Sequence, residues 1–159
     1  MILPWVDYAR GSRTVLPSSI VGTITGTVKM RPEFTHQQLL ALVAIYDEFL
    51  ALDSGMARKF ASAVNANWRH PWAKDVLDCD DQEALFRAER VKARRRAGFK
   101  KAEAFGGIDY ESTGRKGQHW ASWAVVVENG NLRMKAYQPD VDEWQEPDKE
   151  CGDVLFFDA

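Results

Sequence analysis

The sequence contains only two cysteines, Cys79 and Cys151, which lie 72 positions apart. Thiols this few and this far apart exclude a small disulfide scaffold and a zinc-finger spacing, and they favour a reducing compartment. The amino terminus has no basic stretch ahead of an apolar one, so we expect no secretory signal. Together these features predict a cytoplasmic protein without a disulfide.

Long apolar runs are also missing. The longest run covers residues 39–46, which is eight residues, whereas a membrane span needs about 20. The three histidines are not at helical metal-ligand spacing, and the glycines of residues 22–27 lack the Gly-Lys-Ser/Thr ending of a phosphate loop. We therefore expect no membrane contact, no metal and no cofactor.

The composition itself is that of an ordinary globular protein. The chain has 159 residues, of which 45% are hydrophobic and 28% are charged. A chain of this length buries enough surface to form a core, and it fits a single domain covering residues 1–159. The pattern along the chain predicts the α+β class, with an N-terminal β segment, central helices and a C-terminal antiparallel sheet.

Residues 1–31 are expected to be β structure, because Ile20–Val28 is rich in β-branched residues with small and apolar residues on one face. Residues 34–105 are expected to be helical. Thr35 and Gln38 form a capping box at the start of the first helix. A second helix begins at Ser54, and a short helical turn is expected at residues 71–77.

A further helix is expected from about Asp80, where Glu83 completes a second capping arrangement, to about Ala97. Gly98 would end this helix. Downstream, Asn129-Gly130 is the preferred pair for a two-residue hairpin turn.

This turn sets the register of the hairpin. It pairs Val127 with Leu132, and every second pair after that one lies on the same apolar face. The other face, which carries Ser122, Ala124 and Val126, is expected to be more exposed to water. A last strand, Val154–Phe157, should join the same sheet.

The formal net charge of −2 conceals two blocks of opposite sign. Residues 87–116 hold ten basic and four acidic side chains, whereas residues 138–159 hold eight acidic side chains and one lysine. On a helix, Arg87, Arg90 and Arg94 fall within about 60° of one another. With Arg95 and Lys101 they are our candidate residues for binding a phosphate or an acidic partner.

Two other interpretations of the charges stay open. The basic residues can form a solvated helix face that pairs partly with the acidic segment, and the pI of 5.9 argues against a dedicated nucleic-acid binder. The acidic segment can be a solvated loop or can mimic a nucleic-acid backbone. Trp144 lies within it, either as an interface anchor or folded back on the core.

Signs of catalysis are few. Glu111 and His119, with Arg115 or Lys116, could cleave RNA by acid–base catalysis, but a polar loop between strands explains the same residues. The acidic neighbours of Cys79 should raise the pKa of its thiol, which makes Cys79 a poor nucleophile. We assign no catalytic residue from the sequence.

The segment Cys151-Gly-Asp-Val-Leu-Phe-Phe resembles the Gly-Asp-hydrophobic-Phe-Phe strand of NlpC/P60-type cysteine peptidases. In that family the catalytic cysteine precedes this strand on a helix and the histidine follows it. Only Asp158 and Ala159 follow it here, so the resemblance implies a β-strand and no more.

The sequence thus favours a small intracellular protein that binds a partner and has no enzymatic activity. We expect a stoichiometric inhibitor or adaptor, of the immunity or phage anti-defence kind, that acts on a nucleic-acid-handling complex. One alternative is an RNA- or DNA-binding module that uses the Arg87–Lys101 block. A second is a small metal-independent nuclease. The oligomeric state is not predicted.

Overall fold

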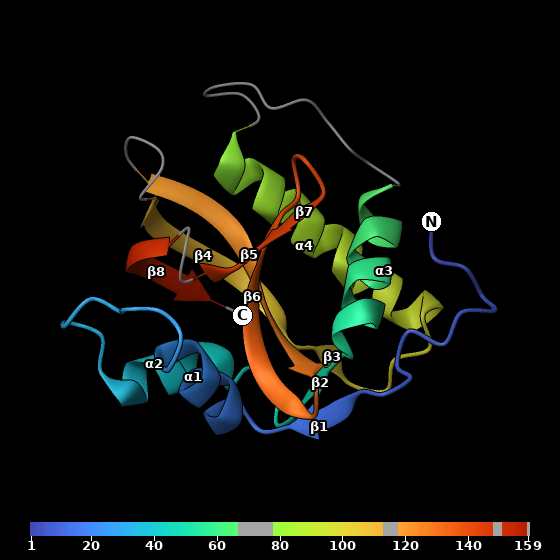
Figure 1. The fold of residues 1–159 in the computed structure, drawn as a ribbon, viewed down its shortest axis with the longest axis horizontal. Coiled ribbons are helices and arrows are strands. Elements are labelled where there is room, and N and C mark those ends of the chain that lie inside the picture. The colour runs from blue at the N-terminus through green and yellow to red at the C-terminus, as the bar shows by residue number, and fades with distance from the viewer. Residues whose placement is uncertain (67–77, 113–117, 148–150, 159) are drawn as a thin grey trace.

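The computed structural model describes residues 1–66, 78–112, 118–147 and 151–158 (Figure 1). Within these ranges the chain forms four helices and eight strands, so the α+β class predicted from the sequence is confirmed. In chain order they are β1 (Arg13–Val15), α1 (Pro17–Thr25), α2 (His36–Val43), β2 (Phe49–Ala51), α3 (Ser54–Asn65), α4 (Cys79–Arg96), β3 (Ala102–Glu103), β4 (Phe105–Ser112), β5 (Gln118–Glu128), β6 (Asn131–Gln138), β7 (Glu143–Gln145) and β8 (Cys151–Asp158).

The centre of the fold is a five-stranded antiparallel sheet in the order β7-β6-β5-β4-β8. A three-stranded sheet, β1-β2-β3, lies at one end of it, where β3 leads directly into β4. Backbone hydrogen bonds from Ala104 to Leu50 and from Val127 to Leu52 connect the two sheets. The segment before α2 lies along the edge of the large sheet that β8 forms, where Met30 makes a parallel β-bridge with Val154.

Helices cover both faces of the large sheet (Figure 1). Helices α1 and α2 pack on one face, with Ile20, Ile24 and Trp123 in the core between them and the strands. Helices α3 and α4 pack on the other face around Phe60 and Phe86. The large sheet is therefore the middle layer of three, and both of its faces are apolar.

The register of the Asn129-Gly130 hairpin is confirmed. Val127 pairs with Leu132, and five further pairs follow without a shift as far as Ser122 with Tyr137. Both turn residues have positive φ, 51° and 78°, as a type I′ turn requires. The expectation of a wetter face is wrong, because α3 and α4 bury that face as well; the pattern of one strand does not report a second covering layer.

The helix signals are confirmed in α2 and α4. Thr35 accepts a hydrogen bond from the Gln38 backbone, and the Gln38 side chain bonds back to Thr35, which is the predicted capping box. Helix α4 ends at the predicted place, where Gly98 has a φ of +72°. It begins at Cys79, and the predicted capping pair of Asp80 with Glu83 is wrong, because Asp78 is the N-cap and forms the capping box with Asp81. The turn expected at residues 71–77 lies outside the described residues.

The N-terminal β segment is present only as β1, and the expectation that Ile20–Val28 forms a strand is wrong. Pro17 stands at the start of α1, where its missing N–H costs nothing. Ile20, Val21 and Ile24 then fall on one buried helix face. Burial against the sheet outweighs the weak β preference of these side chains.

None of the helices in the described part of the chain is long and apolar enough to cross a lipid bilayer.

Candidate functional site

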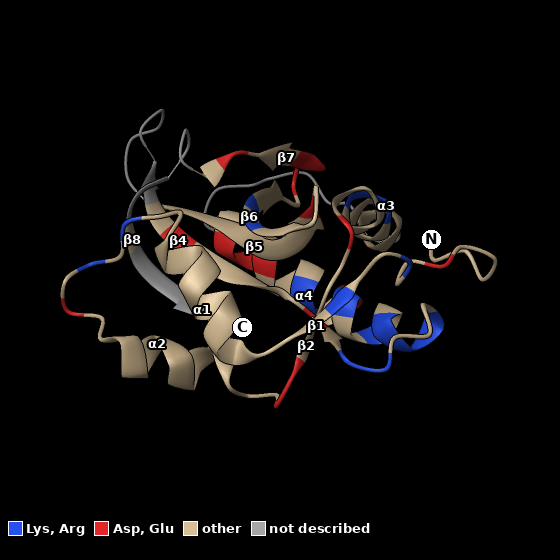
Figure 2. Cartoon of the chain, turned by 60° about the horizontal axis from the view of Figure 1, so that its bottom comes forward, with Lys and Arg blue, Asp and Glu red and all other residues tan. Residues whose placement is uncertain are grey.

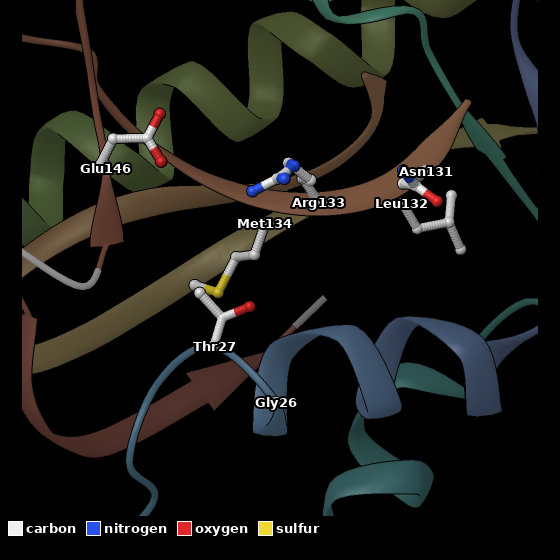
Figure 3. Close-up of a pocket in the computed structure, with 7 residues that line it drawn as sticks. All are labelled: Gly26, Thr27, Asn131, Leu132, Arg133, Met134 and Glu146. Carbon is white, nitrogen blue, oxygen red and sulfur yellow. The ribbon is translucent and has the colours of Figure 1, made fainter. Parts of the chain in front are cut away.

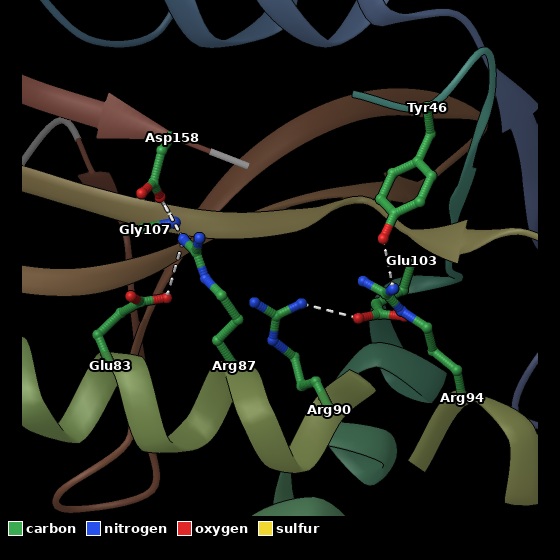
Figure 4. A network of polar contacts seen from close by, with 8 residues as sticks. All are labelled: Tyr46, Glu83, Arg87, Arg90, Arg94, Glu103, Gly107 and Asp158. Carbon is green, nitrogen blue, oxygen red and sulfur yellow. Dashed lines mark hydrogen bonds and ion pairs between the residues drawn. The ribbon is translucent and has the colours of Figure 1, made fainter. Parts of the chain in front are cut away.

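The arginines that the spacing predicts on one side of α4 are present there, but their side chains point toward the interior of the protein (Figure 4). Arg90 is only 1% exposed, and its Nη1 lies 2.7 Å from Oε1 of Glu103. Arg94 binds the other oxygen of the same carboxylate, with 2.6 Å between Nε and Oε2. The guanidinium of Arg90 also packs over the rings of Phe86 and Phe105. These arginines neutralise a buried glutamate.

The other candidate cations also have acidic partners, with one exception. Arg87 pairs with Glu83 and with Asp158 of β8. Lys101 pairs with Glu48 at 2.6 Å. Of the acidic partners named here, Asp158 belongs to the C-terminal acidic block, whereas Glu48, Glu83 and Glu103 lie elsewhere in the chain. Among the five candidates Arg95 and Lys101 are exposed, and no acidic partner of Arg95 is found in the described part of the chain. Figure 2 shows the lysines and arginines of the chain in blue.

Trp144 folds back on the protein. Its ring centroid lies 4.9 Å from that of Tyr137 and 6.0 Å from that of Phe105, on the face of the sheet that α3 and α4 cover. The side chain thus closes a core rather than projecting from the acidic segment.

A cavity of about 400 Å³ lies between the end of α1 and strand β6 (Figure 3). Thr27 and Met134 project into it, and Arg133 and Glu146 lie along its rim. Its lining combines few apolar groups with one cation and one carboxylate. We find no arrangement of a nucleophile and a base among these side chains.

A more reactive arrangement lies where α4 begins. Cys79 is the first residue of α4, and its thiol is free. Its Sγ accepts a hydrogen bond of 3.4 Å from the backbone N–H of Trp120 in β5. The thiol is thus held against the central sheet, at the end of a helix where backbone N–H groups have no partner within the helix.

His119 immediately precedes Trp120 and is buried, with 5% of its surface exposed. Its Nε2 lies 2.5 Å from Oε1 of Gln138 on the neighbouring strand β6. An amide oxygen can only accept, so Nε2 carries the hydrogen. In neutral imidazole the second nitrogen, Nδ1, is then the basic one.

The thiol and the imidazole belong to the same small region. Since the Trp120 nitrogen is bonded to the carbonyl carbon of His119, standard bond lengths place Sγ of Cys79 within about 6 Å of the His119 Cα. The thiol, the imidazole and the amide oxygen thus belong to α4, β5 and β6 in this one region. A nucleophile, its base and a group that orients the base are the three parts that thiol catalysis uses.

Burial raises the pKa of the Cys79 thiol above its ordinary value, and the carboxylates of Asp78 and Asp80 raise it further. The hydrogen bond from the Trp120 N–H acts in the opposite direction. The pKa of Asp80 is raised as well, mainly because it shares a hydrogen bond with Asp78. At neutral pH the thiol is protonated at rest, as its acidic neighbours in the sequence predict. A nucleophile in this state needs an adjacent base.

The sequence did not indicate this grouping. It paired His119 with Glu111, but the side chain of Glu111 and the residues Arg115 and Lys116 lie outside the described part of the chain. One signal was available: the hairpin register places Gln138 opposite Ala121, so His119 and Gln138 share a face as diagonal neighbours. The approach of Cys79 depends on how α4 packs, which no local pattern reports.

No protein-family model matches the chain, and no curated protein matches it in sequence. Among solved structures, one titled "PSL1a-E64 complex" is similar, with a TM-score of 0.66 and 18% identity, over 91% of this chain and 50% of that chain. Another is the Polyporus squamosus lectin bound to the human-type influenza-binding epitope Neu5Aca2-6Galb1-4GlcNAc, with a TM-score of 0.61, 18% identity, and coverage of 92% and 49%. The chain thus spans about half the length of these two chains, and at this identity the likeness concerns the fold alone.

Proposed function

We propose that this protein is a thiol-dependent acyl-transfer enzyme, a hydrolase of peptide or ester bonds, with Cys79 as nucleophile and His119 as base. The observation that carries the proposal is the 2.5 Å contact between Nε2 of His119 and Oε1 of Gln138, one residue from the backbone N–H that binds Sγ of Cys79. It holds the imidazole with Nδ1 as its basic nitrogen, in the residue that precedes the Trp120 N–H bound to the thiol. This proposal differs from the non-enzymatic function that the sequence favours.

The first half of the reaction forms a thioester. Nδ1 of His119 takes the proton of the Cys79 thiol while Sγ bonds to the substrate carbonyl carbon, and the electron pair of the C=O bond moves to oxygen. The N–H groups at the start of α4 that Asp78 leaves unpaired would stabilise that oxyanion. The tetrahedral intermediate collapses, and the leaving group departs with the proton from His119.

The second half restores the enzyme. His119 removes a proton from water as the water oxygen attacks the thioester carbon. The C–S bond breaks, and the imidazolium returns the proton to Sγ. Gln138 does not touch the substrate; it orients the imidazole and stays neutral throughout.

The similar fold of PSL1a, whose structure is titled as a complex with E64, suggests a probe for this site. E64 is an epoxide that alkylates reactive cysteine thiolates. The sialylated glycan in the other title belongs to a chain about twice as long as this one, so glycan binding is not part of the proposal.

The test uses p-nitrophenyl acetate as an activated ester and E64 as a trapping reagent. We expect one acetyl group, and separately one E64 molecule, on Cys79 by mass spectrometry of a proteolytic digest. Cys79→Ala should abolish both, whereas the matched variant Cys151→Ala should retain both. His119→Ala should slow acetylation by about 10² to 10⁴, the usual contribution of a general base. Equal labelling of the two cysteine variants would refute the proposal.

Partner binding remains a second proposal, and one surface feature favours it. Ile45 and Val91, which are 58% and 49% exposed, line the same pocket beside Arg94. Exposed apolar side chains next to arginine are typical of protein interfaces. If a stoichiometric partner is captured from the native host, Ile45→Asp with Val91→Asp should release it, whereas Val141→Asp, at an equally exposed site elsewhere, should not.

Fewer basic side chains can bind nucleic acid than the sequence suggested. Because Arg87, Arg90 and Arg94 are ion-paired, direct phosphate binding would depend on Arg95 and on its exposed neighbours Arg96 and Lys100. Replacing these three by glutamine should flatten the salt dependence of any RNA or DNA binding. RNA cleavage that persists in His119→Ala would exclude the nuclease proposal.

A further inference from the structure

Three strands meet around the side-chain amide of Gln138, which is 1% exposed. Its oxygen faces His119 of β5, as described above. Its nitrogen donates two hydrogen bonds, one of 3.2 Å to Oη of Tyr110 in β4 and one of 3.0 Å to Oε1 of Gln145 in β7. Both N–H donors and the oxygen of this amide are therefore used.

The orientation of this amide decides what His119 can do. The oxygen and nitrogen ends of a glutamine amide have nearly the same shape, so packing alone does not distinguish them. Were the amide turned over, its N–H₂ group would face Nε2, which would then have to be the acceptor. Neutral His119 would carry its hydrogen on Nδ1, and that nitrogen could no longer take a proton from the thiol.

We propose that Tyr110 and Gln145 are positioning residues that hold the Gln138 amide with its oxygen toward His119 and so select the Nε2–H tautomer. The selection of the tautomer stands by itself, whereas its importance for catalysis rests on the proposed function. The distances that carry the inference are the three contacts of the Gln138 amide.

The two residues contribute differently. A tyrosine hydroxyl can both donate and accept, so Tyr110 satisfies the amide nitrogen but would also tolerate a turned amide. Its ring in addition contacts the ring of His119 edge-on, with centroids 5.5 Å apart. In its observed orientation, Oε1 of Gln145 accepts from this nitrogen and would repel an oxygen placed opposite it. Gln145 in this orientation therefore contributes more to the polarity than Tyr110, and a carboxylate at position 145, which cannot turn to present a donor, would fix the polarity completely.

This difference allows a matched set of variants at one position. Gln145→Glu supplies an ionised carboxylate, which accepts only, and should keep the amide as it is. Gln145→Leu keeps a side chain of similar size but removes the acceptor. Gln145 is half-buried in the edge strand β7, where either change is compatible with folding. Tyr110→Phe removes only the hydroxyl at the other contact.

The experiment reads the tautomer directly from the ¹⁵N chemical shifts of the His119 ring, in long-range ¹H–¹⁵N spectra of the full chain above the pH at which the imidazole titrates. We expect the Nε2–H form in the original protein and in Gln145→Glu. In Gln145→Leu and Tyr110→Phe we expect a mixture that contains the Nδ1–H form, and more of it when the two changes are combined. The backbone amide spectrum shows whether each variant is folded.

Steady-state kinetics with the ester substrate gives the second measurement. Loss of the correct tautomer should lower kcat by about tenfold in Gln145→Leu and leave KM unchanged, because substrate binding does not involve this amide. Gln145→Glu should restore kcat. If Gln145 had a merely structural role, kcat would fall to the same extent in Gln145→Leu and Gln145→Glu.

The outcomes separate the two proposals. An Nδ1–H form in the original protein, or an unchanged tautomer in the folded double variant, would overturn the positioning inference. If Tyr110→Phe does not fold, the comparison of Gln145→Leu with Gln145→Glu decides alone. A tautomer that responds as expected in a protein that forms no acyl-enzyme would support the positioning inference and refute the proposed function.

Discussion

The thiol of Cys79 and the backbone N–H of Trp120 are joined by a hydrogen bond of 3.4 Å, although the two residues lie 41 positions apart. This contact connects the beginning of α4 to the middle of the central sheet. It places the thiol at the point in β5 where the histidine and the tryptophan adjoin. A small shift of α4 along the sheet would therefore move the proposed nucleophile, Cys79, away from the proposed base, His119.

The first prediction concerns the pH dependence of the thiol. The carboxylate of Asp80 destabilises the thiolate and thereby raises the pKa of Cys79. In Asp80→Asn this repulsion is absent, so the thiol pKa falls and more thiolate is present at a given pH below it. We expect alkylation by iodoacetamide at pH 7 to accelerate by about two- to fivefold, as suits an exposed charge pair.

The control for this prediction is Asp47→Asn, which removes an exposed carboxylate on the loop after α2. It should leave the alkylation rate unchanged. The effect of Asp80→Asn should also shrink at high salt, because the charges are partly exposed. An alkylation rate that is the same in both variants would mean that Asp80 does not act on the thiol.

The second prediction concerns Glu103, which is fully buried and accepts hydrogen bonds from Arg90 and Arg94 (Figure 4). Removing one partner of a buried ion pair leaves an uncompensated charge. Glu103→Leu should therefore lower the free energy of unfolding by about 3–5 kcal/mol, measured by urea denaturation. In the double variant with Arg90→Met the loss should be smaller, since the stranded guanidinium is gone.

The exposed pair of Glu89 and Lys92 on the same helix provides the comparison. Glu89→Ala should cost no more than about 1 kcal/mol, because solvent screens such pairs. A Glu103→Leu variant as stable as Glu89→Ala would contradict the role of Glu103 as the charge that holds α4 to β3.

The third prediction concerns Glu83, which lies in α4 beside Arg87. Burial raises the pKa of Glu83, and the arginines Arg87 and Arg90 offset only part of this rise. A raised pKa means that the folded state binds more protons than the unfolded state. Stability therefore falls as the pH rises from the unfolded value, about 4.3, through the folded one.

Glu83→Gln removes this titration. The urea midpoint of the variant should decline less between pH 4 and pH 7 than that of the original protein, so the variant gains relative stability toward neutral pH. Arg87 stays in place through Asp158 in both proteins. Parallel pH profiles of the two proteins would show that Glu83 titrates normally.

The fold could be predicted wherever a signal is local. The Asn129-Gly130 turn fixes both dihedral angles and register, so the pairing of β5 with β6 follows from two residues. The capping box at Thr35 is equally local. The expected strand over Ile20–Val28 is wrong because its small and β-branched residues match two periodicities. The buried face of α1 is determined by a sheet whose first strand begins only at Phe105.

The candidate site could be predicted only in part, for the same reason. The register of the hairpin implies that His119 and Gln138 are neighbours on one face of the sheet. The thiol joins them through the packing of α4, whose extent was predicted but whose position on the sheet was not. For the arginines of α4 the spacing was predicted correctly. Spacing alone, however, does not show whether such a helix face points to solvent or inward, where Arg90 and Arg94 neutralise Glu103.

The last prediction compares two glycines, Gly106 and Gly22, to test how tightly β8 closes the fold. A Cβ on Gly106 would overlap the backbone oxygen of Asp158 and the indole of Trp123, which themselves form a hydrogen bond of 2.7 Å. Neither neighbour can yield, since one is backbone and the other fills the core. Gly106→Ala should lower the free energy of unfolding by about 3 kcal/mol or more, as overpacking in a tight core does.

Gly22 lies in α1 with open space where a Cβ would be placed, and its φ is not in the left-handed region. Gly22→Ala should therefore raise the free energy of unfolding by up to about 1 kcal/mol, because alanine loses less backbone entropy in a helix. Urea denaturation of both variants checks the pair. If Gly106→Ala were tolerated, β8 would have to move away from β4, and the bond between Asp158 and Trp123 would be broken. Loss of the Trp123 indole N–H from its bonded position in the amide spectrum would reveal that movement, so a stable Gly106→Ala protein with an unchanged indole signal would contradict the close packing of β8.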